Sequence, residues 1–267
     1  MRPARGARTV VTAVALLAAV ALLAALVLLA EVVVVAAAAA EPAVTDVAAL
    51  PPARSAELEP FDASYSWSWH GATVAVSTLK LEHGDGDSWI YSSTTRPSGI
   101  GYLYPMRPVL SSSLSITDQG VRPLSFKAEG GGAGRNADVS FDWNAGRASG
   151  MYEGTVVDLP LTAGIQDDLS VQIAMMVELI HGRTPEQLSI IDRNSTRDYR
   201  YRREGTETIS TRLGPIYTVI YSSQHPGSPR VTRFWCAPSR GYLPMRVEQK
   251  RINSVEWTMD IRSLQRD

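Results

Sequence analysis

Few residues of this sequence have the types and spacings that support chemistry. The four histidines (His70, His83, His181 and His225) stand near segment ends or turns, and their spacing matches no metal-binding motif. No Gly-x-Ser-x-Gly pattern supplies a nucleophile. The adjacent acids Asp167 and Asp168 are explained as caps of a helix. We therefore expect a protein that is not an enzyme and uses no metal and no cofactor. A hydrolase whose residues meet only in the fold is the weaker alternative.

Aromatic and methionine side chains form the first candidate binding site. All six tryptophans lie in predicted strands, where they either fill a closed core or line an apolar cavity. Two methionines of the predicted helix could adapt to a flexible apolar ligand such as an acyl chain, although ordinary core methionines are the simpler interpretation. The candidate ligand-binding residues are Trp67, Trp69, Trp89, Trp143, Met175 and Met176.

A long loop at residues 96–108 is the second candidate. It contains three prolines and two glycines around an apolar tip. A loop of this length with its own aromatic residues is often a lid or a partner site, but it can also fold back and plug the end of a barrel. The candidate contact residues are Ile100, Tyr102, Leu103, Tyr104 and Met106.

The elements that must position these residues are mostly strands. At residues 61–70 apolar and polar residues alternate with a period of two, and the run at 216–261 reads as further strands separated by Pro- and Gly-rich turns. This pattern predicts a mainly β fold. We expect a single antiparallel meander of about ten to twelve strands, curled into a barrel or half-barrel.

One amphipathic helix is predicted at residues 168–181. Asp167 or Asp168 can cap its start, and Gly182 stands where a C-terminal cap belongs. Its apolar residues fall on one stripe, with Gln172 and Glu178 outside it. The helix should pack on or in the sheet.

The charge pattern argues against a nucleic-acid partner. The formal net charge is −1, which provides no basic field. Arg200, Arg202 and Glu204 share one face of a predicted strand. We interpret them as a solvated face with cross-strand charge pairs, and an anion site is the less favoured alternative.

The N-terminus predicts export. Residues 1–40 combine three arginines with a long apolar run and read as a signal peptide or an N-terminal membrane anchor. Residues 41–60 form an Ala- and Pro-rich linker, and residues 61–267 form the β-rich domain. We expect a periplasmic or otherwise exported protein, held at the inner membrane by residues 10–30 if the signal is retained.

Several markers carry a resemblance to a known family. The order at residues 234–248, an aromatic strand, then Ala-Pro, then Gly-Tyr-Leu-Pro-Met-Arg-Val-Glu, resembles the ending of the bacterial exported family called Domain of Unknown Function 3108. Further matches are the opening strand at 61–65, the hairpin at 141–146 and Asp-Leu-Ser at 168–170. The resemblance covers residues 61–264. It implies an envelope protein with a barrel-like β body and no assigned chemistry.

These observations lead to two main hypotheses. The first is a non-catalytic envelope protein that binds a lipid or another apolar molecule in a barrel-like cavity. The alternative is an envelope interaction module that docks a protein or glycan partner through the loop at 96–108. A cavity that reaches the helix favours the first hypothesis, and a packed interior with an exposed apolar tip favours the second. The sequence does not indicate an oligomeric state.

Overall fold

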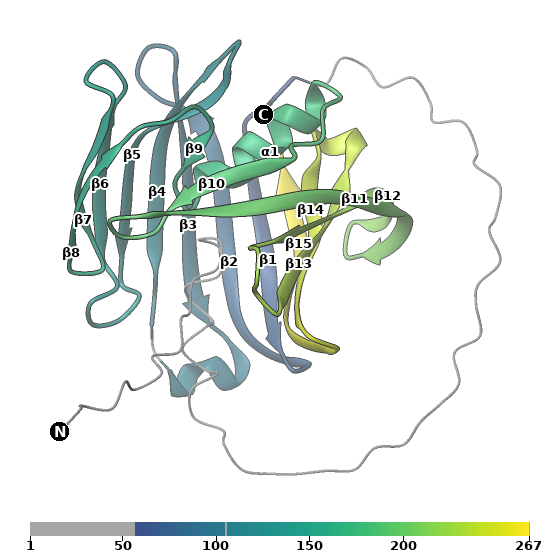
Figure 1. Cartoon of the computed structure of the whole chain (residues 1–267). Helices are drawn as coiled ribbons and strands as arrows, with labels where there is room; N and C mark the ends of the chain where they lie inside the picture. Colours follow the sequence, from purple (N-terminus) through teal and green to yellow (C-terminus); the bar gives the residue numbers. More distant parts are fainter. Residues whose placement is uncertain (1–56, 105, 267) are drawn as a thin grey trace.

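The computed structural model describes residues 57–104 and 106–266 (Figure 1). The export segment predicted at 1–40 and nearly all of the linker predicted at 41–60 lie outside these residues and stay predictions. Within the described parts of the chain, no helix is long and apolar enough to cross a membrane.

Fifteen strands form one sheet, in the order β8-β7-β6-β5-β4-β3-β2-β1-β15-β14-β13-β12-β11-β10-β9. The strands are β1 (Phe61–Trp69), β2 (Ala72–His83), β3 (Ser88–Pro97), β4 (Val109–Thr117), β5 (Gly120–Glu129), β6 (Ala137–Asp142), β7 (Arg147–Tyr152), β8 (Thr155–Pro160), β9 (Ile165–Gln166), β10 (Gln187–Ile191), β11 (Thr196–Thr211), β12 (Gly214–Gln224), β13 (Arg230–Ala237), β14 (Leu243–Arg251) and β15 (Ser254–Gln265). The first and last strands pair with each other in the middle of the sheet. Neighbouring strands are antiparallel except for β9 and β10, which are parallel.

The alternation of apolar and polar residues in β1 produces its two faces. Phe61, Ala63, Tyr65 and Trp67 are buried, and the residues between them are half-buried. On the inner face, Trp67 Nε1 donates to Ser77 Oγ at 2.7 Å. The meander predicted from this pattern is confirmed.

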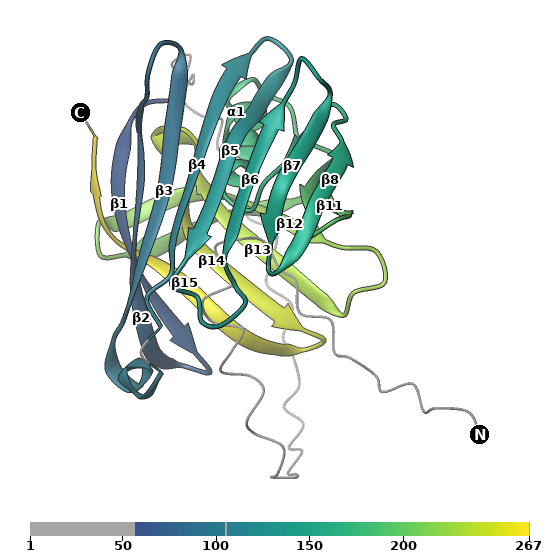
Figure 2. The same ribbon diagram turned by 90° about the vertical axis from the view of Figure 1, so that its left-hand side faces the viewer.

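The sheet is strongly curled and remains open. Register shifts interrupt six strand pairs, and such bulges bend a strand and increase its twist. Figure 2 shows β3 to β8 side by side as one wall, with the helix behind it. The edge strands β8 and β9 do not pair with each other. The fold is therefore a half-barrel, and it has more strands than the ten to twelve expected, because short strands such as β9 leave little periodic signal.

The helix α1 (Ser170–Ile180) lies inside the curl. Asp167 Oδ1 accepts the backbone N–H groups of Leu169 and Ser170 at 2.8 Å each, so Asp167 supplies the predicted cap. Gly182 has φ +74°, the left-handed conformation that ends helices. The expected polar face is only partly present, because Gln172 is 6% exposed. A helix enclosed by a sheet has neighbours on several sides, so periodicity alone overstated its solvent-facing stripe.

Candidate functional site

A small apolar cavity lies in the interior beside the helix. Trp67 of β1 and Met175 of α1 both line it, together with residues of β11, β13, β14 and β15. Its volume is about 20 Å³, which is room for about one water molecule. Ligand pockets usually measure about 300–1,000 Å³. Side chains of the helix and the sheet fill the space that the barrel hypothesis assigned to a lipid.

Of the six predicted ligand-binding residues, Trp67 and Met175 line this cavity and the other four do not. Met176 is 1% exposed but does not line the cavity. Trp69, Trp89 and Trp143 are half-buried and do not line it either. Trp143 donates to the Pro123 carbonyl at 2.7 Å, which fixes it outside the interior site. A ligand-binding role for these residues stays a prediction.

The loop predicted at 96–108 presents an exposed apolar tip. It contains the short helix η3 (Gly99–Leu103), which packs against β2 and β3. Ile100 is 47% exposed, Tyr102 69% and Leu103 79%. Tyr104 and Met106 are half-buried. The tip therefore points outward and does not plug the interior.

Close backbone contacts hold the base of this tip. The Ser98 N–H donates to the Val74 carbonyl at 2.9 Å, and the Tyr104 N–H donates to Gly101 at the same distance. A Cβ added at Gly101 would lie 1.7 Å from the Val74 carbonyl oxygen. Only glycine permits this approach, so the backbone of the tip is fixed against β2.

Two buried acids precede the helix. Asp167 is 1% exposed and, besides capping the helix, accepts a hydrogen bond from Ser112 of β4 at 2.6 Å. Burial raises its pKa, while the hydrogen bonds from Ser112, Ser170 and Leu169 act in the opposite direction. Asp167 thereby ties the start of the helix to the wall of the half-barrel.

Asp168 lies in a more charged environment. It is 5% exposed and accepts a hydrogen bond from the Tyr152 hydroxyl at the end of β7. Burial raises the pKa of Asp168 to about 8; the Tyr152 hydrogen bond lowers it, and the nearby charges of Asp167, Asp192 and Glu153 raise it further. Asp168 is therefore a neutral acid at neutral pH. It is buried between the two ends of the sheet, one formed by β6 to β8 and the other by β9 to β11.

Ion pairs surround this junction. Asp192, after β10, binds Arg197 at 2.7 Å and Arg193 at 3.3 Å, and Arg193 also pairs with Glu153 from the turn after β7. The Asn194 side chain accepts the backbone N–H of a β8 residue at 2.8 Å. Side chains thus link the β8 end and the β9 end of the sheet, which no strand pairing joins.

This junction has the geometry of a structural cluster rather than a catalytic one. A general acid must contact its substrate, and the carboxyl group of Asp168 is enclosed. In residues 57–104 and 106–266, no three His, Cys, Asp or Glu side chains are grouped to hold a metal ion. Sequence reasoning assigned both acids to capping and missed the Tyr152 partner, since a contact across the fold leaves no local pattern.

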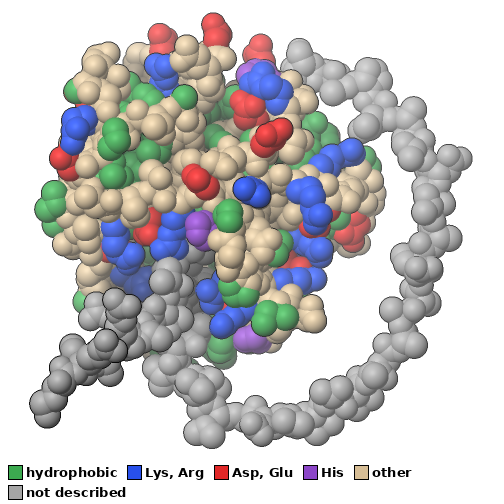
Figure 3. All heavy atoms as spheres, viewed as in Figure 1, with side chains coloured by type: hydrophobic (Ala, Val, Ile, Leu, Met, Phe, Trp, Pro, Cys, Tyr) green, Lys and Arg blue, Asp and Glu red, His purple; other side chains and the backbone are tan. Residues whose placement is uncertain are grey.

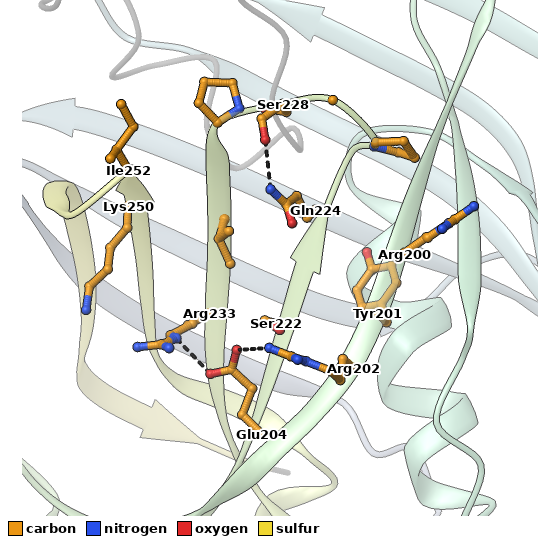
Figure 4. A pocket seen from close by; sticks show the side chains of 14 residues that line it. Arg200, Tyr201, Arg202, Glu204, Ser222, Gln224, Ser228, Arg233, Lys250 and Ile252 are labelled. Atoms are coloured by element: carbon orange, nitrogen blue, oxygen red, sulfur yellow. Dashed lines mark hydrogen bonds and ion pairs between the residues drawn. The ribbon is translucent and has the colours of Figure 1, made fainter.

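A second pocket, of about 780 Å³, lies over β11 to β14 (Figure 4). Arg200, Arg202 and Glu204 line it, so the face shared by these three residues in the sequence is confirmed. Arg233 and Lys250 join them from β13 and β14. Sequence reasoning did not find these two residues, because the strand pairing that brings them together is non-local. In Figure 3 several Lys and Arg side chains group on the right-hand part of the face shown.

Comparison with solved structures supports the fold. A beta-barrel-like protein of Domain of Unknown Function DUF1849 from Brucella abortus matches with a TM-score of 0.50 and 9% identity, covering 79% of this chain and 99% of that one. A protein of Bacteroides fragilis, provisionally described as exported and with a YmcC-like fold, has a TM-score of 0.38 and 9% identity over 78% and 96% of the two chains. The second likeness is too weak to carry an inference.

Comparison with curated proteins gave no significant match. Comparison with protein families did give a match. Residues 62–260 match the model described as "Protein of unknown function (DUF3108)", and they coincide with the stretch whose markers resembled that family. Because the match covers most of the chain, this protein belongs to the DUF3108 family.

Proposed function

We propose that this protein is a non-catalytic binding module of the cell envelope, and that its η3 tip docks on an anionic membrane surface. One observation carries the proposal: Ile100, Tyr102 and Leu103 project together from a tip whose backbone is fixed on β2. Exposed apolar groups that gather at one place mark an interaction surface more often than scattered ones do.

The chemistry of the tip suits a lipid surface. Full burial of a side chain the size of leucine or isoleucine contributes about 1.5–3 kcal/mol, and tyrosine favours the boundary between lipid and water. Arg96 and Arg107 flank the loop and are exposed. Each arginine near an anionic membrane adds about 1 kcal/mol. Apolar insertion and charge attraction would act together at this tip.

Vesicle sedimentation tests the proposal. The protein is mixed with vesicles of phosphatidylethanolamine and phosphatidylglycerol, and in parallel with vesicles of phosphatidylcholine. We expect binding to the anionic vesicles and a loss of about tenfold or more in the variant Ile100→Ser, Tyr102→Ser, Leu103→Ser. Both vesicle experiments use protein without residues 1–40, because that apolar segment would bind lipid by itself.

A matched control uses exposed apolar residues elsewhere. Met151 is 45% exposed and Val156 is 64% exposed, both on the wall formed by β7 and β8. The variant Met151→Ser, Val156→Ser should bind vesicles like the unmodified protein. Equal binding by the tip variant and the unmodified protein would reject the docking surface.

An apolar guest in the interior is the second candidate function. Trp67 and Met175 both line the small apolar cavity beside the helix, and methionine adapts to different ligands. With a volume of about 20 Å³, entry of an acyl chain would require the helix to move away from the sheet. Native mass spectrometry of protein exported in a bacterial host decides this candidate. A stoichiometric lipid, lost on Trp67→Asp, would support it, and an apo mass with no uptake of added fatty acid would reject it.

Location in the envelope is part of the proposal. It is supported by the basic and apolar pattern of residues 1–40, which lie outside the described residues. Fractionation of cells that express the full chain, followed by N-terminal sequencing, would distinguish a cleaved signal from a retained anchor.

A further inference from the structure

We propose that the pocket over β11 to β14 binds a phosphate ester with a small hydroxylated body, a site distinct from the η3 tip. It lies on the face of the sheet turned away from α1, since Val231 and Arg233 of β13 line it whereas Thr232 between them lines the interior cavity. Its volume of about 780 Å³ is within the range of small-ligand sites.

Strand register builds the floor of the pocket. Ser222 of β12 pairs with Arg202 on one side and with Arg233 on the other. A small side chain thus stands between two long ones in this row. Figure 4 shows Arg202 and Arg233 on either side of Ser222, with the Glu204 carboxylate between their guanidinium groups.

One carboxylate holds both arginines in place. Glu204, whose side chain is 15% exposed, lies 3.3 Å from Arg202 Nη2 and 2.7 Å from Arg233 Nε. It stands at the register shift of β11 between Arg203 and Gly205. A single carboxylate cannot neutralise two guanidinium groups, so donors remain available to a ligand.

The pocket keeps a surplus of positive charge. Lys250 pairs with Glu248 at 3.2 Å, and Arg200 has no ion pair among the residues that the structure describes. Four cationic side chains thus line the pocket, and two carboxylates, Glu204 and Glu248, pair with three of them. Planar guanidinium groups bind phosphate through two parallel hydrogen bonds, which matches the excess donors here.

The arrangement favours a small anion over a macromolecule. Beneath the pocket, β12 and β13 are paired on both sides at Ser222 and Arg233, so these two strands offer no free edge to a peptide strand. Tyr201 is the one aromatic residue among those that line the pocket, and its ring stacks on Phe234, with centroids 6.5 Å apart. Without a free aromatic face, bases of a single-stranded nucleic acid have nothing to stack on. Gln224 donates its amide N–H to the Ser228 carbonyl at 2.7 Å, and its side-chain oxygen can accept from a ligand hydroxyl.

Isothermal titration with glucose 6-phosphate as the probe tests this site. We expect saturable binding at low ionic strength that weakens with added NaCl, and no binding of glucose. The variant Arg202→Gln, Arg233→Gln should lose about tenfold or more in affinity. The single variant Arg202→Gln, at a side chain 78% exposed, leaves Glu204 paired with Arg233 and should also lose affinity, and Lys250→Gln provides a further variant with an expected loss.

A matched control replaces an exposed, ion-paired arginine elsewhere. Arg183→Gln removes a guanidinium group bound to Glu178 beyond the end of α1, and it should leave affinity unchanged. No binding of glucose 6-phosphate, or the same loss in the control as in the pocket variants, would overturn the proposal. The tip variant should bind the probe normally, so failure here is separable from failure of membrane docking.

The source of the phosphate ester is decided by competition. If the ligand is a free ester, vesicles containing phosphatidylglycerol should not displace glucose 6-phosphate from the tip variant. If the ligand is a lipid head group, the vesicles should displace glucose 6-phosphate from the tip variant. The Arg202→Gln, Arg233→Gln variant should then not bind those vesicles through this pocket.

Discussion

Replacement of Asp168 by asparagine should remove much of the pH dependence of stability above about pH 4. Asp168 is 5% exposed at the start of α1 and accepts a hydrogen bond from Tyr152. Burial raises its pKa to about 8, and the nearby acids Asp167, Asp192 and Glu153 add to this effect. The unfolded chain returns the carboxyl group to water, where its pKa is about 3.9.

The sign of the effect follows from these two pKa values. Between about pH 4 and pH 8 the folded protein holds one more proton at Asp168 than the unfolded chain does. The free energy of unfolding therefore falls as pH rises through this window and levels off above it. The slope is up to about 1.4 kcal/mol per pH unit, or about 4 kcal/mol from pH 5 to pH 8. That loss is large against a typical total of about 5–15 kcal/mol.

Asparagine keeps an oxygen that can accept the Tyr152 hydrogen bond and does not ionise. The Asp168→Asn variant should lose most of this slope, whatever its stability at a single pH. Asp167 keeps a slope of the same sign, because burial raises its pKa as well. Glu178 contributes a slope of the opposite sign, because the hydrogen bond from Arg183 lowers the pKa of Glu178. This contribution is confined to acid pH.

Urea unfolding followed by tryptophan fluorescence, at each pH unit from about 5 to 9, measures both profiles. Asp138→Asn, with a side chain 69% exposed on β6, is the matched control and should keep the slope of the unmodified protein. Parallel profiles for Asp168→Asn and the unmodified protein, at an unchanged m value, would refute a neutral, buried Asp168.

Three further substitutions test the packing. Gly101→Ala should cost about 1–3 kcal/mol in urea unfolding, because its Cβ would stand 1.7 Å from the Val74 carbonyl oxygen. Met175→Ala should cost about 2–5 kcal/mol by enlarging the cavity beside the helix, measured in the same way. Arg197→Ala leaves the 7% exposed Asp192 carboxylate without its 2.7 Å partner, which should lower the free energy of unfolding by about 3–5 kcal/mol.

Each of these predictions has an outcome that would contradict it. Gly205→Ala meets no atom within 4 Å and should change stability by less than about 1 kcal/mol, so an equal loss at Gly101 and Gly205 would reject the close-contact argument. A loss below about 1 kcal/mol at Met175 would mean that the helix side chains are not tightly packed. An unchanged midpoint for Arg197→Ala would mean that Arg193 alone satisfies Asp192.

Local patterns predicted several elements of the fold correctly. The alternation in β1 identified its buried face, and Gly182 marked the end of the helix. The helix was found, but its environment was not: Gln172 is buried, because a curled sheet surrounds the helix. Periodicity reports which residues share a face, whereas burial depends on what the chain places against that face.

By itself, the sequence determined the strand pattern, the helix before Gly182, the shared face of Arg200, Arg202 and Glu204, and the family. Only the tertiary structure decided that side chains fill the interior, that the tip at Ile100 projects outward, and that Asp168 meets Tyr152. The physical reason is the range of the interactions. Propensity, capping and alternation act between near neighbours in the chain, whereas cavity volume, a raised pKa and surplus charge arise from residues that the sheet brings together from distant segments.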